Sequence, residues 1–300
     1  MKVLPLITVT RTQVANRALK DGRVAPEGYE LVFEEVDPLI RAFRLMVRRL
    51  EYDVCELAAT TYLCAREHGK PLVALPVFLV RQFHHGAILV HRNAGIERPR
   101  DLEGTRVGVN RGYTVTTGVW ARGILADEYG VDLDRVTWVL SGDEHVAEYR
   151  PPENVVPIEE GDDLADLLVR GELAGAIGVE VDHPDVVRLI PDADEAGFRA
   201  LAARGHYPIN HLVVVRQELL AENPGVARAV FDAFEQAKDL YVEEGELEPT
   251  HRRVREITGR DPLPYGVDPN RAALEELVGH ALRQGILTRP PELQSLFAEI

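Results

Sequence analysis

The chain has 300 residues, of which 45% are hydrophobic and 28% are charged, and its formal net charge is −15. No apolar run approaches the roughly 20 residues needed to span a bilayer, which argues against a membrane partner. The balance of 34 Lys and Arg against 49 Asp and Glu argues against nucleic acid, because phosphate binding needs a basic face. An anionic ligand would therefore need a local basic site within an acidic protein.

The chain up to residue 90 alternates between strand and helix patterns. Ile40, Phe43 and Val47, for example, recur at the spacing of one helical face. Strands are expected at 2–10, 29–36, 52–60 and 71–79, and helices at 37–51 and 60–69. This order predicts a parallel sheet covered by helices on both faces.

The strand and helix pattern then starts again. Strands are expected at 86–93, 105–109, 136–140, 173–179 and 209–217, helices at 111–125 and 162–172, and mostly helix from 223 onward. The apolar strands at 86–90 and 211–215 stand before and after this second unit. We therefore predict an α/β protein with two α/β lobes joined by two crossover strands and a helical C-terminal tail. Lobe 1 is expected to comprise residues 1–90 plus 206–300, and lobe 2 residues 91–205.

The cysteines and the first residues indicate a cellular location. Cys55 and Cys64 have neither a CxxC nor a metal-site spacing and are expected to be reduced thiols. Residues 1–10 lack a small-residue cleavage site and are expected to form a strand, not a signal peptide. Both features predict a cytoplasmic protein.

Polar side chains gather where the strand at 105–109 becomes a helix. Ligands of open α/β sheets bind beyond the carboxyl ends of the strands, where helix N-termini present unpaired N–H groups. The residues that could add to such a site here are Asn110, Arg111, Tyr113, Thr114, Thr116 and Thr117. We predict that they bind an anion, either a carboxylate or a phosphate, with Tyr113 available to stack on an aromatic ring. The alternative is that one threonine caps the helix and Arg111 is solvated.

Basic side chains gather at the first crossover strand and just before it. Arg81, His84, His85 and His91 lie within eleven residues, and neighbours on a strand point to opposite faces. Only one histidine of the adjacent pair is therefore expected to be catalytic, and we assign His85 to the cleft. The alternative is one loop histidine and one structural histidine. A metal site would need a third ligand from elsewhere and is not favoured.

Carboxylates and a histidine follow the strand at 136–140. Asp143 and Glu144 stand beside His145, and a carboxylate can fix the tautomer of an imidazole and raise its basicity. The alternative is a polar loop with a helix cap.

Two further candidate groups lie at the ends of lobe 1 strands. Asn210 and His211 precede the apolar return strand, where His211 either faces the cleft or pins the hinge. Glu56 and the pair Thr60 and Thr61 end the strand at 52–60, and a threonine of that pair capping the next helix is the simpler reading.

Several segments resemble a known family. Residues 95–109 and 162–178 are similar to the elements that build the second lobe of type II periplasmic-binding-protein folds. Segments 52–63, 111–125, 143–146, 207–216 and 223–234 together resemble the 4,5-dihydroxyphthalate decarboxylase family, and the resemblance covers most of the chain. It implies a bilobal fold, an aromatic acid as ligand and no transport role. It also favours a functional role for the segment 143–146.

Decarboxylation of a dihydroxylated aromatic diacid needs a base, an acid near a ring carbon and a grip on the spectator carboxylate. We expect the helix start at 111–117 to hold that carboxylate. Two of His85, His145 and His211 are expected to move protons, with Asp143 or Glu144 orienting one of them. Further substrate contacts are expected from Glu56, Thr60, Arg81, Asn110 and Asn210.

No organic cofactor is expected, because the sequence has no GxGxxG, P-loop or Schiff-base signature; a divalent metal is the less favoured alternative. Two other functions are kept open: a solute-binding protein of an ABC transporter for a small organic acid, and a menaquinone-route enzyme of the same fold. The expected partner is a small aromatic acid, and the apolar helical tail would suit a homo-oligomer.

Overall fold

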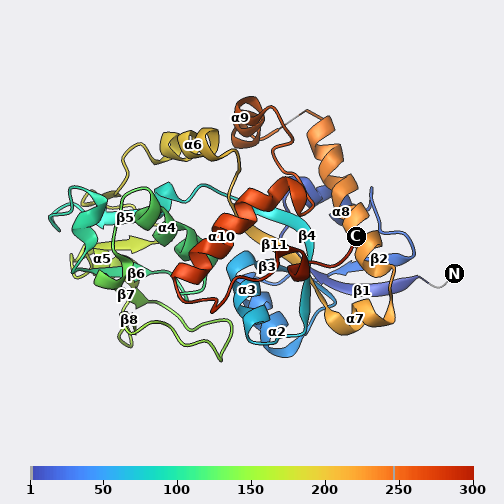
Figure 1. The fold of residues 1–300 in the computed structure, drawn as a ribbon, viewed down its shortest axis with the longest axis horizontal. Coiled ribbons are helices and arrows are strands. Elements are labelled where there is room, and N and C mark those ends of the chain that lie inside the picture. The colour runs from blue at the N-terminus through green and yellow to red at the C-terminus, as the bar shows by residue number, and fades with distance from the viewer. Residues whose placement is uncertain (1–2, 246) are drawn as a thin grey trace.

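The computed structural model describes residues 3–245 and 247–300. Its strands form two separate sheets, one in each lobe, and Figure 1 shows the two lobes side by side. This arrangement confirms the predicted bilobal α/β fold.

The first lobe contains a five-stranded sheet in the order β2-β1-β3-β11-β4. Its strands are β1 (Leu4–Val9), β2 (Tyr29–Phe33), β3 (Val54–Ala58), β4 (Leu72–Arg81) and β11 (Ile209–Arg216). Its helices are α1 (Arg17–Lys20), α2 (Ile40–Arg49), α3 (Ala59–Glu67), α7 (Gln217–Glu222), α8 (Val226–Glu243), α9 (Pro249–Thr258) and α10 (Arg271–Arg283). The helix α2 illustrates why they form, since it buries Phe43, Met46 and Val47 on one face and exposes arginines on the other.

The second lobe contains a six-stranded sheet in the order β10-β5-β9-β6-β7-β8. Its strands are β5 (Ile88–His91), β6 (Arg106–Val109), β7 (Thr137–Leu140), β8 (Val155–Pro157), β9 (Gly175–Ile177) and β10 (Val186–Arg188). Its helices are α4 (Thr116–Asp127) and α5 (Leu164–Val169), and α6 (Ala193–Arg204) leads back to the first lobe.

The first sheet was expected to be parallel throughout, and one strand departs from that expectation. The strand β11 runs antiparallel to both β3 and β4, and it lies between them. The reason is the path of the chain: β3 and β4 end at the lobe boundary, whereas β11 starts there after the chain returns. The carboxyl ends of β1 and β3 therefore face the second lobe.

The chain passes between the lobes at 82–87 and at 189–208. Neither of the two strands expected to cross between the lobes does so, because each belongs to one sheet. Ile88–Val90 pair with β9 of the second lobe, and His211–Val215 pair with β3 of the first. The first crossing therefore lies a few residues before the expected boundary at residue 90.

The helix α10 joins the lobes. Figure 1 shows it running across the middle of the molecule, over the region where α4 meets the first lobe. Its His280 packs edge-on against Trp120 of α4, with ring centroids 5.0 Å apart. Gln284, just beyond α10, accepts a hydrogen bond from Arg122 at 2.8 Å and donates one to the carbonyl of Val119 at 2.9 Å. The two lobes therefore share a packed core. No helix within the described residues is both long enough and apolar enough to cross a bilayer.

A network of partly exposed charges ties the crossings to α4 and α10. Glu128, the residue that follows α4, accepts from His85 at 3.0 Å and is paired with Arg204. Glu276 of α10 pairs with Arg204 at 2.9 Å and with His206 at 2.9 Å. Burial acts against ionisation of Glu276, but hydrogen bonds from His206 and His280 and the charge of Arg204 outweigh it and lower the pKa of its carboxyl well below its usual 4.5.

Replacing Glu276 with glutamine is expected to lower the free energy of unfolding at pH 7 by about 2 kcal/mol, because charge-assisted hydrogen bonds are lost. A carboxyl whose pKa is lower in the folded state stabilises the protein above its usual value of 4.5 and loses that contribution as the pH falls. Urea titrations at pH 7 and pH 4 should therefore show a smaller difference between variant and wild type at pH 4. Glu275→Gln, its exposed neighbour on α10, is the control; an equal loss in both variants would contradict this role of Glu276.

Candidate active site

Three arginines come together at the boundary between the lobes. Arg11 follows β1, Arg44 lies on α2, and Arg111 follows β6; we call them the basic cluster. Partial burial, and then the positive charges of Arg11 and Arg44, lower the pKa of Arg111. Among the described residues, neither Arg11 nor Arg111 has a carboxylate within ion-pair distance, whereas Arg44 pairs with Asp143 at 2.5 Å. The cluster is thus a local basic site in an acidic protein, suited to an anionic ligand.

A carboxylate and an imidazole form a pair next to this cluster. Glu56 of β3 is fully buried and accepts from His211 Nδ1 of β11 at 2.6 Å. The other carboxylate oxygen accepts from the backbone N–H of Arg11 at 2.8 Å. These bonds fix the ring of His211 and leave its Nε2 without a hydrogen bond among the described residues. Glu56, expected to contact substrate, instead orients the histidine.

His145 is the second histidine of the site. Its ring and that of His211 both lie edge-on to Phe43, at centroid distances of 6.0 and 5.3 Å. Its Nδ1 is 3.1 Å from the hydroxyl of Thr61, and its Nε2 is buried with no hydrogen-bond partner in the part of the chain that the structure describes. Burial, followed by the charges of Arg44 and Arg111, lowers the pKa of His145 to about 4, so the imidazole is neutral at pH 7.

The helix start that was expected to bind a substrate carboxylate already holds a carboxylate of this chain. Glu144 accepts from the backbone N–H groups of Tyr113 and Thr114, the latter at 3.2 Å, and from the Thr114 hydroxyl at 2.6 Å. These N–H groups and hydroxyls therefore do bind a carboxylate, as expected of a helix start, but it is a carboxylate of the chain itself. The placement of the substrate is corrected, and Glu144 caps this turn instead of orienting a histidine.

The threonines of the two lobes bind each other. The hydroxyl of Thr60, at the start of α3, donates to the carbonyl of Thr114 at 2.6 Å, and its backbone N–H donates to the hydroxyl of Thr116 at 3.1 Å. All three residues are buried. They connect the N-termini of α3 and α4 across the lobe boundary, and we correct their assignment from substrate contacts to contacts between lobes.

Gly112 leaves the space that Glu144 occupies. A Cβ at this position would lie 2.6 to 3.0 Å from the carboxylate atoms of Glu144, which is closer than real contacts allow. Gly112→Ala is therefore expected to push Glu144 out of its site and to lower the unfolding free energy by about 2 kcal/mol, measured by urea titration. Gly279→Ala in α10, where a Cβ would make only an ordinary van der Waals contact with Arg283 at 3.9 Å, should leave stability unchanged or raise it. Equal stability of the two variants would show that the Glu144 site does not matter.

Asp143 contacts arginines of the first lobe instead of a histidine. It pairs with Arg44 at 2.5 Å and with Arg48 at 2.8 Å, both on α2. Burial acts in the opposite sense, but the hydrogen bond from Arg48 and the charges of Arg44 and Arg48 lower its pKa. The expectation that Asp143 orients an imidazole is therefore corrected.

The other residues expected near Arg111 have mixed positions. Asn110 donates to the carbonyl of Gly178 at 2.7 Å and accepts from Ser141, and Thr117 lies half-buried in the first turn of α4. Tyr113 is buried against the Arg122 guanidinium, 3.8 Å from its ring centroid, so it does not present a face to a ligand. The side-chain oxygen of Asn210 is buried without a partner among the described residues.

Two predicted residues lie outside the site. His85 hydrogen-bonds Glu128 in the network at the crossings and makes no hydrogen bond to Glu56, Thr61 or the basic cluster among the described residues. Arg81 is buried and donates to the carbonyls of Tyr207 and Pro264, both at 2.8 Å, so it fixes the second crossing. Both assignments are corrected for the same reason: Nε2 of His85 and both Nη atoms of Arg81 are bound by other parts of the protein.

Sequence reasoning missed Arg11, Phe43 and Arg44. The position of Arg11, directly after the first strand, is the same signal that singled out Arg111 after β6. Phe43 was assigned only to the apolar face of its helix, and nothing in the pattern of α2 distinguishes Arg44 from its other arginines. The described residues contain no cluster of three His, Cys, Asp or Glu side chains arranged to hold a metal ion.

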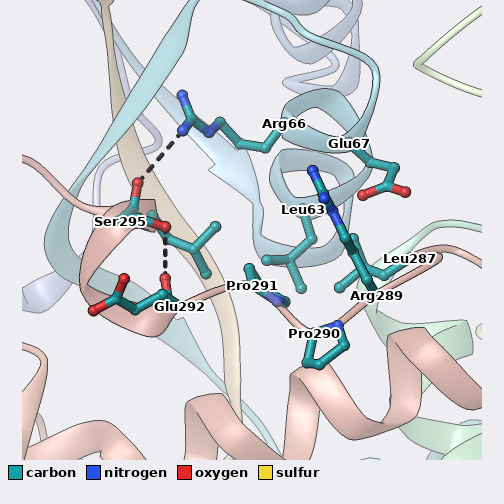
Figure 2. Close-up of a pocket in the computed structure, with 10 residues that line it drawn as sticks. Leu63, Arg66, Glu67, Leu287, Arg289, Pro290, Pro291, Glu292 and Ser295 are labelled. Carbon is teal, nitrogen blue, oxygen red and sulfur yellow. Dashed lines mark hydrogen bonds between the residues drawn. The ribbon is translucent and has the colours of Figure 1, made fainter.

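Two hollows lie outside the basic cluster, since none of its three arginines lines either of them. One, of about 390 Å³, lies between α3 and the C-terminal segment. Arg66 donates there to the carbonyl of Ser295 (Figure 2). No histidine is among the described residues that line it. The other, of about 440 Å³, lies between the first crossing and the start of α4 and is lined in part by Thr117 and Gly178. The second hollow therefore adjoins the lobe boundary, whereas the first does not.

Comparisons with known proteins agree with this architecture. A family model described as NMT1/THI5 like matches residues 46–150. The fold is similar to that of the periplasmic aliphatic sulphonate binding protein from Escherichia coli, with a TM-score of 0.56 and 11% identity over 100% of this chain and 92% of that one. This likeness confirms the periplasmic-binding-protein-like fold, and at 11% identity it carries no information about function.

Two curated proteins are more similar in sequence. The 4,5-dihydroxyphthalate decarboxylase of Comamonas testosteroni is 31% identical over 306 residues, covering 94% of this chain and 92% of that protein. The protein of the same name from Pseudomonas putida is 33% identical over 219 residues, covering 67% of this chain and 84% of that protein. The resemblance seen in the sequence is thereby confirmed, and the chain belongs to the 4,5-dihydroxyphthalate decarboxylase family.

Proposed function

We propose that this protein catalyses the non-oxidative decarboxylation of a hydroxylated aromatic carboxylic acid such as 4,5-dihydroxyphthalate, in the cytoplasm, as a step in phthalate breakdown. The observation that carries the proposal is the basic cluster beside two histidines with different environments, in a chain whose relatives carry this name. Arg11 and Arg111 offer guanidinium groups to the carboxylates, and a guanidinium can bind a carboxylate through two parallel hydrogen bonds.

The two histidines suit opposite proton roles. His145 is neutral, and its Nε2 has no hydrogen-bond partner among the described residues, which suits it to take the proton of a phenol para to the reacting carboxylate. Negative charge on the bound substrate would offset Arg44 and Arg111, whose charges weaken this base in the free protein. His211 is the donor, because Glu56 holds its Nδ1 and fixes the ring so that Nε2 is the nitrogen that can carry a proton to the substrate.

The proposed reaction proceeds by two proton transfers, one at the phenol and one at the ring carbon. His145 removes the phenolic proton, and electron density moves through the ring to the carbon that bears the carboxylate. Protonated His211 transfers its Nε2 proton to that carbon. The bond to the carboxylate breaks, its electron pair restores the aromatic ring, and carbon dioxide leaves. His145 returns its proton to the phenolate oxygen, and His211 recovers one proton from water, so one proton is consumed per carbon dioxide.

Release of carbon dioxide from a panel of acids tests this proposal. The panel contains 4,5-dihydroxyphthalate, 4-hydroxyphthalate, hydroxylated benzoates and, as the control without a phenol, phthalate. Turnover of a hydroxylated acid but not of phthalate is expected. Tight binding of the same acids without any product would favour the solute-binding alternative, which the fold also suits. Turnover of chorismate-derived acids only would favour the menaquinone-route alternative.

A further inference from the structure

One side chain of the first lobe holds three consecutive residues of the second. Nη2 of Arg48, on α2, pairs with Asp143 at 2.8 Å and donates to the carbonyl of Glu144 at 2.6 Å. Its Nε donates to the carbonyl of His145 at 3.0 Å. The Arg48 side chain is 36% exposed, so these bonds lie at the rim of the lobe boundary and not in the core.

His145 itself depends on both lobes. It follows β7 of the second lobe, yet its ring is bound by Thr61 of α3 and packs against Phe43 of α2, both in the first. Within its own lobe, the segment is held by the Glu144 carboxylate at Tyr113 and Thr114. The imidazole can therefore occupy this position only while the two lobes are together as they are here.

We propose that Arg48 is a positioning residue that couples closure of the lobes to the placement of His145 for proton transfer. This inference rests on the proposed function, because it assigns Arg48 a role in that reaction. The guanidinium fork matters, since one planar group reaches a carboxylate and two carbonyls at once, which a single ammonium group does not do with the same geometry. Arg44 adds a second bond to Asp143 but none to the backbone of this segment.

Steady-state kinetics of Arg48→Met and Arg48→Lys test the inference. Methionine keeps much of the apolar stem and removes every polar contact. Small misplacements of a catalytic group are costly, so kcat of carbon dioxide release should fall about 10- to 100-fold in Arg48→Met, with KM nearly unchanged. Arg48→Lys should recover part of this loss. Arg49→Met is the matched control, because Arg49 is the exposed neighbour on the same helix.

Amide hydrogen exchange of residues 141–149 is measured on the same variants. Faster exchange in Arg48→Met, but not in Arg49→Met, is expected. An unchanged kcat in Arg48→Met overturns the inference, as does a loss of kcat without faster exchange in this segment. If the wild-type protein decarboxylates no acid of the panel, the proposed function fails first and the catalytic part of the inference fails with it. Exchange then decides only whether Arg48 holds the lobes together.

Discussion

Replacing His211 with asparagine is expected to lower kcat for carbon dioxide release by about 10²- to 10⁴-fold, the range typical of a lost general acid or base. Asparagine is smaller than imidazole and can still donate a hydrogen bond to Glu56, but it cannot transfer a proton at neutral pH. Binding should change little, because the basic cluster remains. Values of kcat/KM and of KM, measured with the best acid of the panel, separate a loss of proton transfer from a loss of substrate binding.

Two companion variants sharpen this result. Glu56→Gln keeps the shape of the partner but replaces the carboxylate bond to Nδ1 of His211 by a bond to a neutral amide, which holds the ring less firmly, so a smaller loss of kcat is expected. His183→Asn, in a second-lobe loop beside Asp185, removes a histidine far from the basic cluster in the fold and should behave as wild type. Near-normal turnover of His211→Asn would exclude it as the proton donor.

The second large effect concerns binding. Arg111→Ala is expected to raise KM about 10- to 100-fold, which corresponds to the roughly 1.5–3 kcal/mol of a hydrogen bond to a charged group. The guanidinium has no carboxylate partner among the described residues, so its loss leaves no internal charge unpaired. Added salt should weaken substrate binding to the wild type more than to the variant.

Arg106→Ala is the control for a general effect of charge. Arg106 stands exposed at the opposite end of β6, so its removal changes the net charge by the same amount without touching the lobe boundary. Equal changes in KM for the two variants would contradict a specific contact at Arg111. Arg111→Lys should be intermediate, because an ammonium group keeps the charge and loses the paired geometry.

Local patterns predicted most of the elements that build the site. Helical spacing identified α2, and β-branched runs identified β3, β6 and β11, because those signals depend on near neighbours. The position of β11 between β3 and β4 follows from long-range pairing, which no local pattern reports. Local patterns also could not tell His211 from His85, because long-range contacts decide their positions. His211 lies beside the basic cluster, whereas His85 lies in a charge network between helices distant in sequence.

The helix start at 111–117 shows how a sound chemical argument can assign the wrong partner. Its N–H groups and hydroxyls attract a carboxylate, but the carboxylate that they bind belongs to Glu144, some thirty residues away in sequence. Hydroxyl-rich helix starts indicate what kind of group will bind there. Whether that group comes from a ligand or from the chain depends on packing across the lobe boundary, which the sequence does not display.

The central place of β11 has a consequence for the order in which the protein can assemble. Residues 88–188 form a sheet that is complete in itself, so this lobe can fold during synthesis from a continuous stretch of chain. The other lobe must wait, since β3 and β4 have no strand between them until residues 209–216 leave the ribosome. Until then both strands keep open edges that invite pairing with other chains, and nascent protein is at its most vulnerable to aggregation during that interval.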